Sequence, residues 1–270
     1  MAKTDTPIAT YENSVIENKI TDIVNTALDV NSLLTVDNSL AVNAGLTKTI
    51  HKYTYAGTVE KLAKGAKNTA KGKVTYEAVD YTVNRYQQTY SYNDMDVMKD
   101  PFIVDVLSDG AGKVMANEIR DEYFTEVAKI SRTVKTKGAL TYDNVVDALA
   151  EIGVEAEDGL FLLMGADGKA AIRKDPDFIK SHQGDIIYTG QFGTVCGIPC
   201  VFSKKVPSGK CYATKKSAVT FFVKNAGSVE QDRDIESKDN TVVYERHGVM
   251  ALTDDTESAI ISFNDSTAAA

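Results

Sequence analysis

The chain has 270 residues, of which 43% are hydrophobic and 25% charged, values typical of a globular protein. This length suits one large domain or two modest ones. No run of about 18 apolar residues occurs, which argues against a membrane-spanning helix, and the first residues lack the apolar core of a secretory signal. We therefore expect the chain to fold in a cytoplasm. Its three cysteines are too few for a disulfide framework.

The net charge of −8 is unevenly distributed. Residues 47–73 contain seven lysines and one acid, Glu60, so this segment carries +6 and the remainder −14. A basic segment on an acidic body is complementary between two copies of one chain. It could also contact phosphate groups, but the acidic body would repel nucleic acid and no recognised nucleic-acid motif is present. Self-association is therefore the favoured interpretation.

The N-terminal region combines a polar start with an amphipathic segment. Residues 1–12 are expected to form a flexible arm, and the apolar spacing from Asn13 to Val30 predicts a helix. A mixed connector follows over Asn31–Ala44. Two interpretations remain open for this region: a surface helix with a loop, or an arm that docks on another part of the protein or its assembly.

Residues 46–92 are predicted to form a long β-ribbon. Two segments rich in Thr, Val and Tyr, Thr47–Val59 and Lys73–Tyr92, flank a tip of glycines and lysines, Glu60–Gly72. An isolated two-stranded ribbon is marginal in water because neither face is covered. Its cover must come from elsewhere, and both another copy of the chain and the chain's own domain are consistent with the pattern.

The strongest helical pattern follows the ribbon. Asp100 is a suitable N-cap and Pro101 suits the first helical position, and one apolar stripe continues as far as Ser131. About 30 residues would span roughly 45 Å, which is typical of a spine helix that packs on a sheet. A second helix is predicted over Thr141–Ile152, with its first residue as the cap and Gly153 as the stop.

The second half of the chain alternates short helices and strands. We expect a buried strand over Gly159–Gly165, a helix over Ala166–Lys174, a loop over 181–194 and a strand over 195–203 that Gly197 and Pro199 interrupt. The remaining β-rich segments are Cys211–Ala213, Ala218–Val223, Gly227–Ile235, Thr241–Leu252 and Ser258–Phe263. The predicted fold class is α+β.

No motif predicts a metal or phosphate site. A structural zinc site needs four Cys or His ligands, whereas Cys196 and Cys200 surround a Gly-Ile-Pro turn on an apolar strand, so a buried apolar role is favoured. The segment Gly165–Lys169 is too short for a P-loop, and Ala170 stands where Ser or Thr is required. The acids of 232–239 lack the glycine and terminal glutamate of a calcium loop.

No motif predicts catalysis either. The three histidines, His51, His182 and His247, lie in no local signature of a nucleophile with its base. We therefore expect no catalytic residues, no cofactor and no metal, and predict that the protein is not an enzyme.

The order of these elements, with several short phrases, resembles the tailed-phage major capsid proteins of the Hong Kong 97-like fold. In that family an N-terminal arm precedes an extended loop, here Leu46–Tyr92, and a spine helix, here Pro101–Ser131. The segment Gly193–Pro207 resembles the family's pattern of a Gly, a strand, Gly-x-Pro-Val-x-x-Ser and a nearby Pro. The segments Val229–Asp234 and 246–248 resemble its C-terminal strands.

The resemblance implies that the chain is divided into several parts, of which the axial domain clusters around five-fold and six-fold axes. The implied parts are an N-terminal arm and helix (1–45), an extended β-ribbon loop (46–92), a peripheral domain with the spine helix (93–153 and 226–264), an axial domain (154–225) and a flexible tail (265–270). The extended loop would lie over a neighbouring subunit. The residues predicted to make this intersubunit contact are Lys52, Tyr53, Tyr55, Lys61, Lys64, Lys67, Lys71 and Tyr76.

The implied function is that of a major capsid protein. Hexamers and pentamers would form the icosahedral head shell of a tailed phage around double-stranded DNA, without sequence-specific binding. A separate scaffolding protein and a portal are the expected partners, with assembly in the bacterial host cytoplasm and a final place in the virion. Some family members crosslink a loop lysine to an asparagine, but no partner asparagine is identifiable here. The alternatives are an encapsulin-like shell around a cargo enzyme and, less favoured, an enzyme that uses Cys196 or Cys200.

Overall fold

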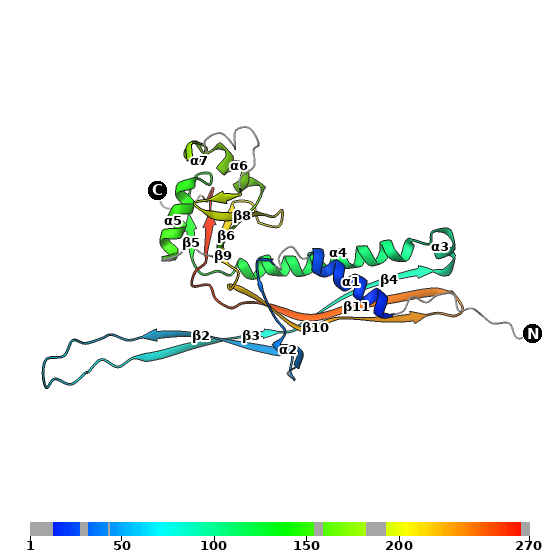
Figure 1. The fold of residues 1–270 in the computed structure, drawn as a ribbon, viewed down its shortest axis with the longest axis horizontal. Coiled ribbons are helices and arrows are strands. Elements are labelled where there is room, and N and C mark those ends of the chain that lie inside the picture. Colours follow the sequence, from blue (N-terminus) through cyan, green and yellow to red (C-terminus); the bar gives the residue numbers. More distant parts are fainter. Residues whose placement is uncertain (1–12, 28–31, 43, 154–158, 182–192, 266–270) are drawn as a thin grey trace, which may run out of the picture.

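The computed structural model describes residues 13–27, 32–42, 44–153, 159–181 and 193–265, which form an elongated body with a projecting arm (Figure 1). Two β-sheets make up the body, and a third, two-stranded sheet forms the arm. In the part of the chain so described, no helix is long and apolar enough to cross a membrane. The mixture of helices and largely antiparallel sheets confirms the predicted α+β class.

The first sheet, here called the central sheet, contains the longest strands. Its order is β1-β10-β11-β4, with β1 parallel to β10 and the other neighbours antiparallel. The strands are β1 (Thr35–Asp37), β4 (Asn84–Asn93), β10 (Val219–Arg233) and β11 (Asp239–Leu252). Helices α1 (Asn13–Ala27) and α4 (Ile103–Val127) lie together over one face of this sheet (Figure 1).

Helix α4 is the spine that the sequence predicted. Its buried side chains recur every three or four residues, which turns one stripe toward the sheet. They include Val104, Ala111, Met115, Ile119 and Tyr123. Gly112 lies where α1 crosses: a Cβ there would come 2.6 Å from Cγ2 of Ile23. A glycine that weakens an isolated helix is therefore needed for the contact between α1 and α4.

The opposite face of the central sheet has its own small core. Phe222, Val249 and Ala251 alternate with residues of the first face and pack against Leu40 of α2 (Ser39–Val42). Three half-buried side chains at the base of the arm complete this cluster: Ile50, Tyr81 and Val83. The base of the arm is thus part of the core of its own chain.

The second sheet has six strands in the order β5-β12-β9-β6-β8-β7. They are β5 (Thr133–Lys135), β6 (Leu160–Met164), β7 (Thr194–Val195), β8 (Ile198–Phe202), β9 (Lys210–Lys215) and β12 (Ala259–Ser262). Three helices accompany it: α5 (Tyr142–Ile152), α6 (Ala166–Lys174) and α7 (Pro176–Ser181). Helix α5 packs against β5 and β12, and its buried residues share a separate core with β6 and β9.

Several sequence predictions are confirmed closely. Helix α5 begins after Thr141, whose side chain forms a capping box with Asn144, and it ends at Gly153, which has a φ of 66°. All five residues of β6 are buried, as predicted for 159–165. Helix α6 has the predicted bounds. The predicted loop at 181–194 lies mostly outside the described residues.

The prediction of one strand over Lys73–Tyr92 is wrong. The segment divides at Val83 into β3 (Lys73–Thr82), which pairs with β2 (Thr47–Ala56) in the arm, and β4, which pairs with β11. The tyrosines of β4 alternate into the core beneath α4, and each is 8% exposed. They are Tyr86, Tyr90 and Tyr92. What distinguishes β4 from β3 is therefore the burial of its tyrosines against the spine helix, because the two strands have similar strand propensity.

Two further boundaries differ from the predictions. An unpredicted short helix, α3 (Asp94–Lys99), precedes the spine, and Asp100 is its C-cap. The Asp100 side chain accepts a hydrogen bond from the Phe102 N–H at 3.0 Å, so the Asp-Pro signal marks a break between two helices and α4 begins at Ile103. Strand β10 is continuous where two strands were predicted, with register shifts around Asn225.

Candidate intersubunit surface on the ribbon

The arm is a regular ribbon that points away from the body. Strands β2 and β3 pair antiparallel from Thr47 opposite Thr82 to Ala56 opposite Lys73, and residues 57–72 form the tip (Figure 1). Directly opposite residues share a face of the ribbon, and the face alternates along each strand. The two faces therefore differ in composition and can be described separately.

The first face turns toward the body and is anchored to it. Lys48 lies opposite Tyr81 and Ile50 opposite Val79 on this face, and Ile50 and Tyr81 pack in the small core beneath the central sheet. The Lys48 Nζ atom lies 4.8 Å from the ring centroid of Phe222, a cation–π contact. These contacts hold the base of the ribbon against its own chain.

An ion pair adds to this anchor. Lys52 Nζ lies 3.1 Å from Oδ1 of Asp255, whose Oδ2 accepts a hydrogen bond from the Ser131 N–H at 3.3 Å. Burial raises the pKa of Asp255, but the hydrogen bonds from Lys52 and Ser131 outweigh burial and leave that pKa below its ordinary value. Lys52, predicted to contact a neighbour, is therefore engaged within its own chain. Sequence reasoning missed Asp255, because no local pattern links residues so distant in the sequence.

The second face, here called the aromatic face, has no cover in the described chain. It is defined by His51, Tyr53, Tyr55, Val74 and Tyr76. Tyr53 and Tyr76 lie directly opposite, with ring centroids 6.3 Å apart, and the His51 ring lies about as close to both. The three tyrosines are 68–70% exposed and Val74 is 56% exposed. Exposed apolar side chains grouped in this way are typical of a protein–protein contact.

The tip carries positive charge that the described residues leave unpaired. Lys61, Lys64, Lys67 and Lys71 are exposed, and none forms an ion pair in the part of the chain that the structure covers. The only acid of the tip, Glu60, accepts hydrogen bonds from the Thr69 hydroxyl at 2.7 Å and the Thr69 N–H at 3.0 Å, which lower its pKa. The Glu60 carboxylate thus binds Thr69 on the other side of the tip instead of pairing with the tip lysines.

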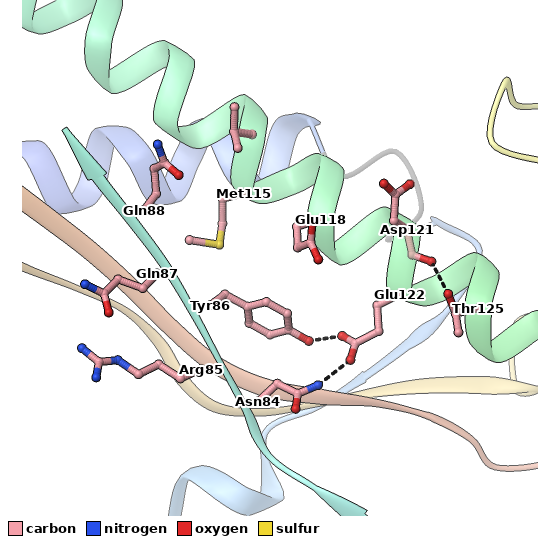
Figure 2. Close-up of a pocket in the computed structure, with 11 residues that line it drawn as sticks. Asn84, Arg85, Tyr86, Gln87, Gln88, Met115, Glu118, Asp121, Glu122 and Thr125 are labelled. Carbon is pink, nitrogen blue, oxygen red and sulfur yellow. Dashed lines mark hydrogen bonds between the residues drawn. The ribbon is translucent and has the colours of Figure 1, made fainter.

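A groove of about 620 Å³ between β4 and α4 is the other candidate site (Figure 2). Glu122 accepts hydrogen bonds from the Tyr86 hydroxyl and, at 2.6 Å, from the Asn84 amide. Burial raises the pKa of both Glu122 and Tyr86. The nearby Asp121 pairs with Lys205 at 2.7 Å. These groups satisfy one another and contain no nucleophile with a base.

Two of the three cysteines, Cys200 and Cys211, are held in the thiol form, and Cys196 lies in a turn. Cys196 and Gly197 have positive φ values of 54° and 80° and occupy the two-residue turn between β7 and β8. Burial raises the pKa of Cys200 to about 12 and also raises the pKa of the fully buried Cys211, so both remain protonated at neutral pH. Among the residues with described positions, no three His, Cys, Asp or Glu side chains group as metal ligands. His182 lies outside the described residues.

Comparison with known proteins identifies the fold. No family model matches the chain, and no curated protein matches it. The capsid of a native GTA particle has a TM-score of 0.71 at 12% identity, covering 88% of this chain and 90% of that chain. The capsid of cyanophage P-SCSP1u has a TM-score of 0.69 at 11% identity, covering 86% of each chain. A virus-like particle from Pyrococcus furiosus has a TM-score of 0.62 at 10% identity, covering 92% of this chain and 98% of that chain.

These matches run through most of the chain and show that it has the Hong Kong 97-like fold of phage capsid proteins. This is the fold that the sequence analysis predicted.

Proposed function

We propose that the protein is a major capsid protein that assembles into an icosahedral head shell around the double-stranded DNA of a tailed phage. The observation that carries the proposal is the aromatic face of the ribbon, on a chain whose fold is that of capsid proteins. A two-stranded ribbon needs cover, and the described part of its own chain covers only the base of the first face. In a shell, a neighbouring copy would supply the cover for the second face.

The two cores support a peripheral and an axial domain. The central sheet with α1 and α4 would form the peripheral domain, and the six-stranded sheet the axial domain. The expected peripheral domain, 93–153 and 226–264, contains α5 and β12, but both pack in the core of the six-stranded sheet. We therefore propose that α5 and β12 belong to the axial domain.

The proposed partners follow from the shell. Copies would form hexamers and pentamers, with a scaffolding protein guiding assembly in the host cytoplasm and a portal at one vertex. Outside residues 47–73 the chain carries −14, which disfavours tight binding of phosphate groups. Packed DNA would therefore lie against the shell without sequence-specific contacts, and the protein would end in the virion.

A second candidate is a shell that holds protein cargo and no genome. The match to a structure described as a virus-like particle, from Pyrococcus furiosus, spans 92% of this chain and supports a shell that is not part of a phage. The two functions differ in what purified particles contain. Nuclease-resistant DNA inside the particles would support the capsid, whereas particles with a protein cargo and no DNA would support the alternative.

Enzymatic activity is not proposed. The solved structures reported above are capsids and a virus-like particle, and the thiolate, which is the nucleophilic form of cysteine, is disfavoured at Cys200 and Cys211. Loss of an assayable activity on Cys200→Ser would reverse this conclusion. Unchanged assembly of the same variant would support the role of Cys200 in the core.

The proposed function is tested by deleting the tip, Glu60–Gly72, from the full chain. The deletion leaves β2 and β3 intact, so the variant should fold and show the circular dichroism and thermal unfolding of the natural chain. It should fail to form shells under conditions, including a supplied scaffold, in which the natural chain forms them. Sedimentation velocity and negative-stain images measure this difference, and normal shells from the deletion variant would contradict the overlap role of the ribbon.

A further inference from the structure

The aromatic face of the ribbon contains one side chain of a type that changes charge near neutral pH, His51. Its ring centroid lies 6.0 Å from that of Tyr53 on the same strand and 5.9 Å from that of Tyr76 on β3. The two tyrosine rings are 6.3 Å apart, so the three rings form one cluster. An ordinary imidazole takes up a proton at about pH 6.5. Protonation would therefore place a positive charge inside an otherwise uncharged group of rings.

Few charged groups surround this imidazole. On the same face, one step toward the base of the ribbon, lies Asp80 of β3, whose carboxylate accepts a hydrogen bond from the Thr49 hydroxyl at 2.6 Å. Lys52 and Glu77 lie opposite each other on the first face, which turns away from His51. Among the residues that the structure describes, no carboxylate forms an ion pair with His51. In the described chain a charged imidazole is therefore solvated mainly by water.

The cost of this charge depends on whether the aromatic face is covered. In the free subunit the charge costs little, because His51 is exposed. In the proposed shell a neighbouring copy covers the face, and burial disfavours the charged form of an imidazole. The free subunit then binds the proton more readily than the assembled subunit, so proton uptake opposes assembly. The contact is at full strength above about pH 6.5 and weakens by about tenfold for each pH unit below it, as long as the covered imidazole stays neutral.

We propose that His51 is a pH sensor in the intersubunit contact of the ribbon. In mild acid its imidazole gains a proton, and the resulting charge lies within the aromatic face where the neighbouring copy covers it. The contact then loosens and the shell releases its subunits. This role rests on the proposed shell function, because the charge is costly only where a neighbouring copy covers the face.

Two carboxylates with shifted pKa values do not produce the same response. Burial raises the pKa of Asp255, but the hydrogen bonds from Lys52 and Ser131 outweigh burial and leave that pKa below 3.8, so Asp255 stays charged in mild acid. Burial also raises the pKa of Glu122, so the folded chain binds a proton there more readily than the unfolded chain does. Acidification therefore favours folding through Glu122 and does not open the subunit.

Sedimentation velocity of the full-length chain at about pH 7.5 and about pH 5.5, with a scaffold supplied if one is required, tests the proposal. The assembled fraction of the natural chain should be about tenfold or more lower at the acidic pH. His51→Gln and His51→Phe, which are uncharged at both values, should assemble equally at both. His51→Lys, which is charged at both, should assemble poorly at both. As a matched control, His247→Gln, in β11 of the central sheet, should keep the response of the natural chain.

Circular dichroism and thermal unfolding of the free subunits separate assembly from folding, and the His51 variants should match the natural chain in both. A natural chain that assembles equally at the two pH values would overturn the role of His51 and leave the shell function standing. The same conclusion would follow if His51→Gln and His51→Phe kept the full pH response, or if neither assembled at the higher pH. If the natural chain forms no shell at either pH with a scaffold present, the proposed function fails and this inference fails with it.

Discussion

Two groups of tyrosines in neighbouring strands differ sharply in their exposure to solvent. Tyr53 and Tyr76 in the ribbon are 69% and 68% exposed, whereas Tyr86 and Tyr90 in β4 are each 8% exposed. All four lie in one sequence segment of similar composition. The difference comes from what each strand faces: β4 lies beneath α4, and no other described part of the chain covers the aromatic face of β2 and β3. Exposure at the ribbon is therefore better explained by assembly than by folding.

The largest expected effect on folding is at Tyr90. Its ring is buried under the spine and its hydroxyl lies 3.0 Å from the Ser108 Oγ. Replacing it by alanine leaves a cavity in the core and should lower the free energy of unfolding by about 3 kcal/mol or more. Urea denaturation of the free subunit measures this change. A loss below about 1 kcal/mol would mean that β4 is not part of the main core.

The comparison also shows how much the sequence could predict. Periodicity and caps predicted α5, α6 and most of the spine, because those signals are local: Thr141, Gly153 and the stripe of α4 act within a few residues. The division at Val83 could not be predicted, because β3 and β4 have the same propensity and differ only in their partners, β2 and β11. The Lys52–Asp255 pair was missed for the same reason.

The next prediction concerns the exposed tyrosines. Tyr53→Ser with Tyr76→Ser replaces two exposed side chains, so the free energy of unfolding of the subunit should change by only about 0.5 kcal/mol for each position. Assembly should fall strongly, because tyrosine is enriched among the few interface residues whose truncation costs about 2 kcal/mol or more. Subunit stability is read from denaturation and assembly from sedimentation. If subunit stability fell as much as assembly, the ribbon tyrosines would contribute to folding as the tyrosines of β4 do, which would contradict the prediction.

A smaller effect is expected at the base of the ribbon. Lys52→Ala removes a partly exposed ion pair and should lower the free energy of unfolding by about 1 kcal/mol or less at neutral pH. The pKa of Asp255 is lower in the folded chain than its ordinary value of 3.8, so this stabilisation is present above pH 3.8 and is lost as the pH falls through the folded pKa. The difference between natural chain and variant should therefore vanish in acid. A difference that grows on acidification would contradict the ion pair as its cause.

The smallest expected effect is at the tip. Thr69→Val removes the hydroxyl donor to Glu60 but leaves the backbone N–H donor in place. Global stability should stay within about 0.5 kcal/mol, because the tip is exposed. Amide hydrogen exchange at residues 60–70 should become faster in the free subunit, while exchange in β4 stays unchanged. Unchanged exchange at the tip would show that Glu60 does not order it.

The most direct test of the shell account is electron cryo-microscopy of the heavy fraction of the full-length chain, assembled with a scaffolding protein if one is required. The account predicts closed shells in which the aromatic face, with Tyr53 and Tyr76, lies against a neighbouring copy. Shells in which this face remains open to solvent would contradict the role assigned to the ribbon. A chain that remains a 29.3 kDa monomer with scaffold present would contradict the shell function itself.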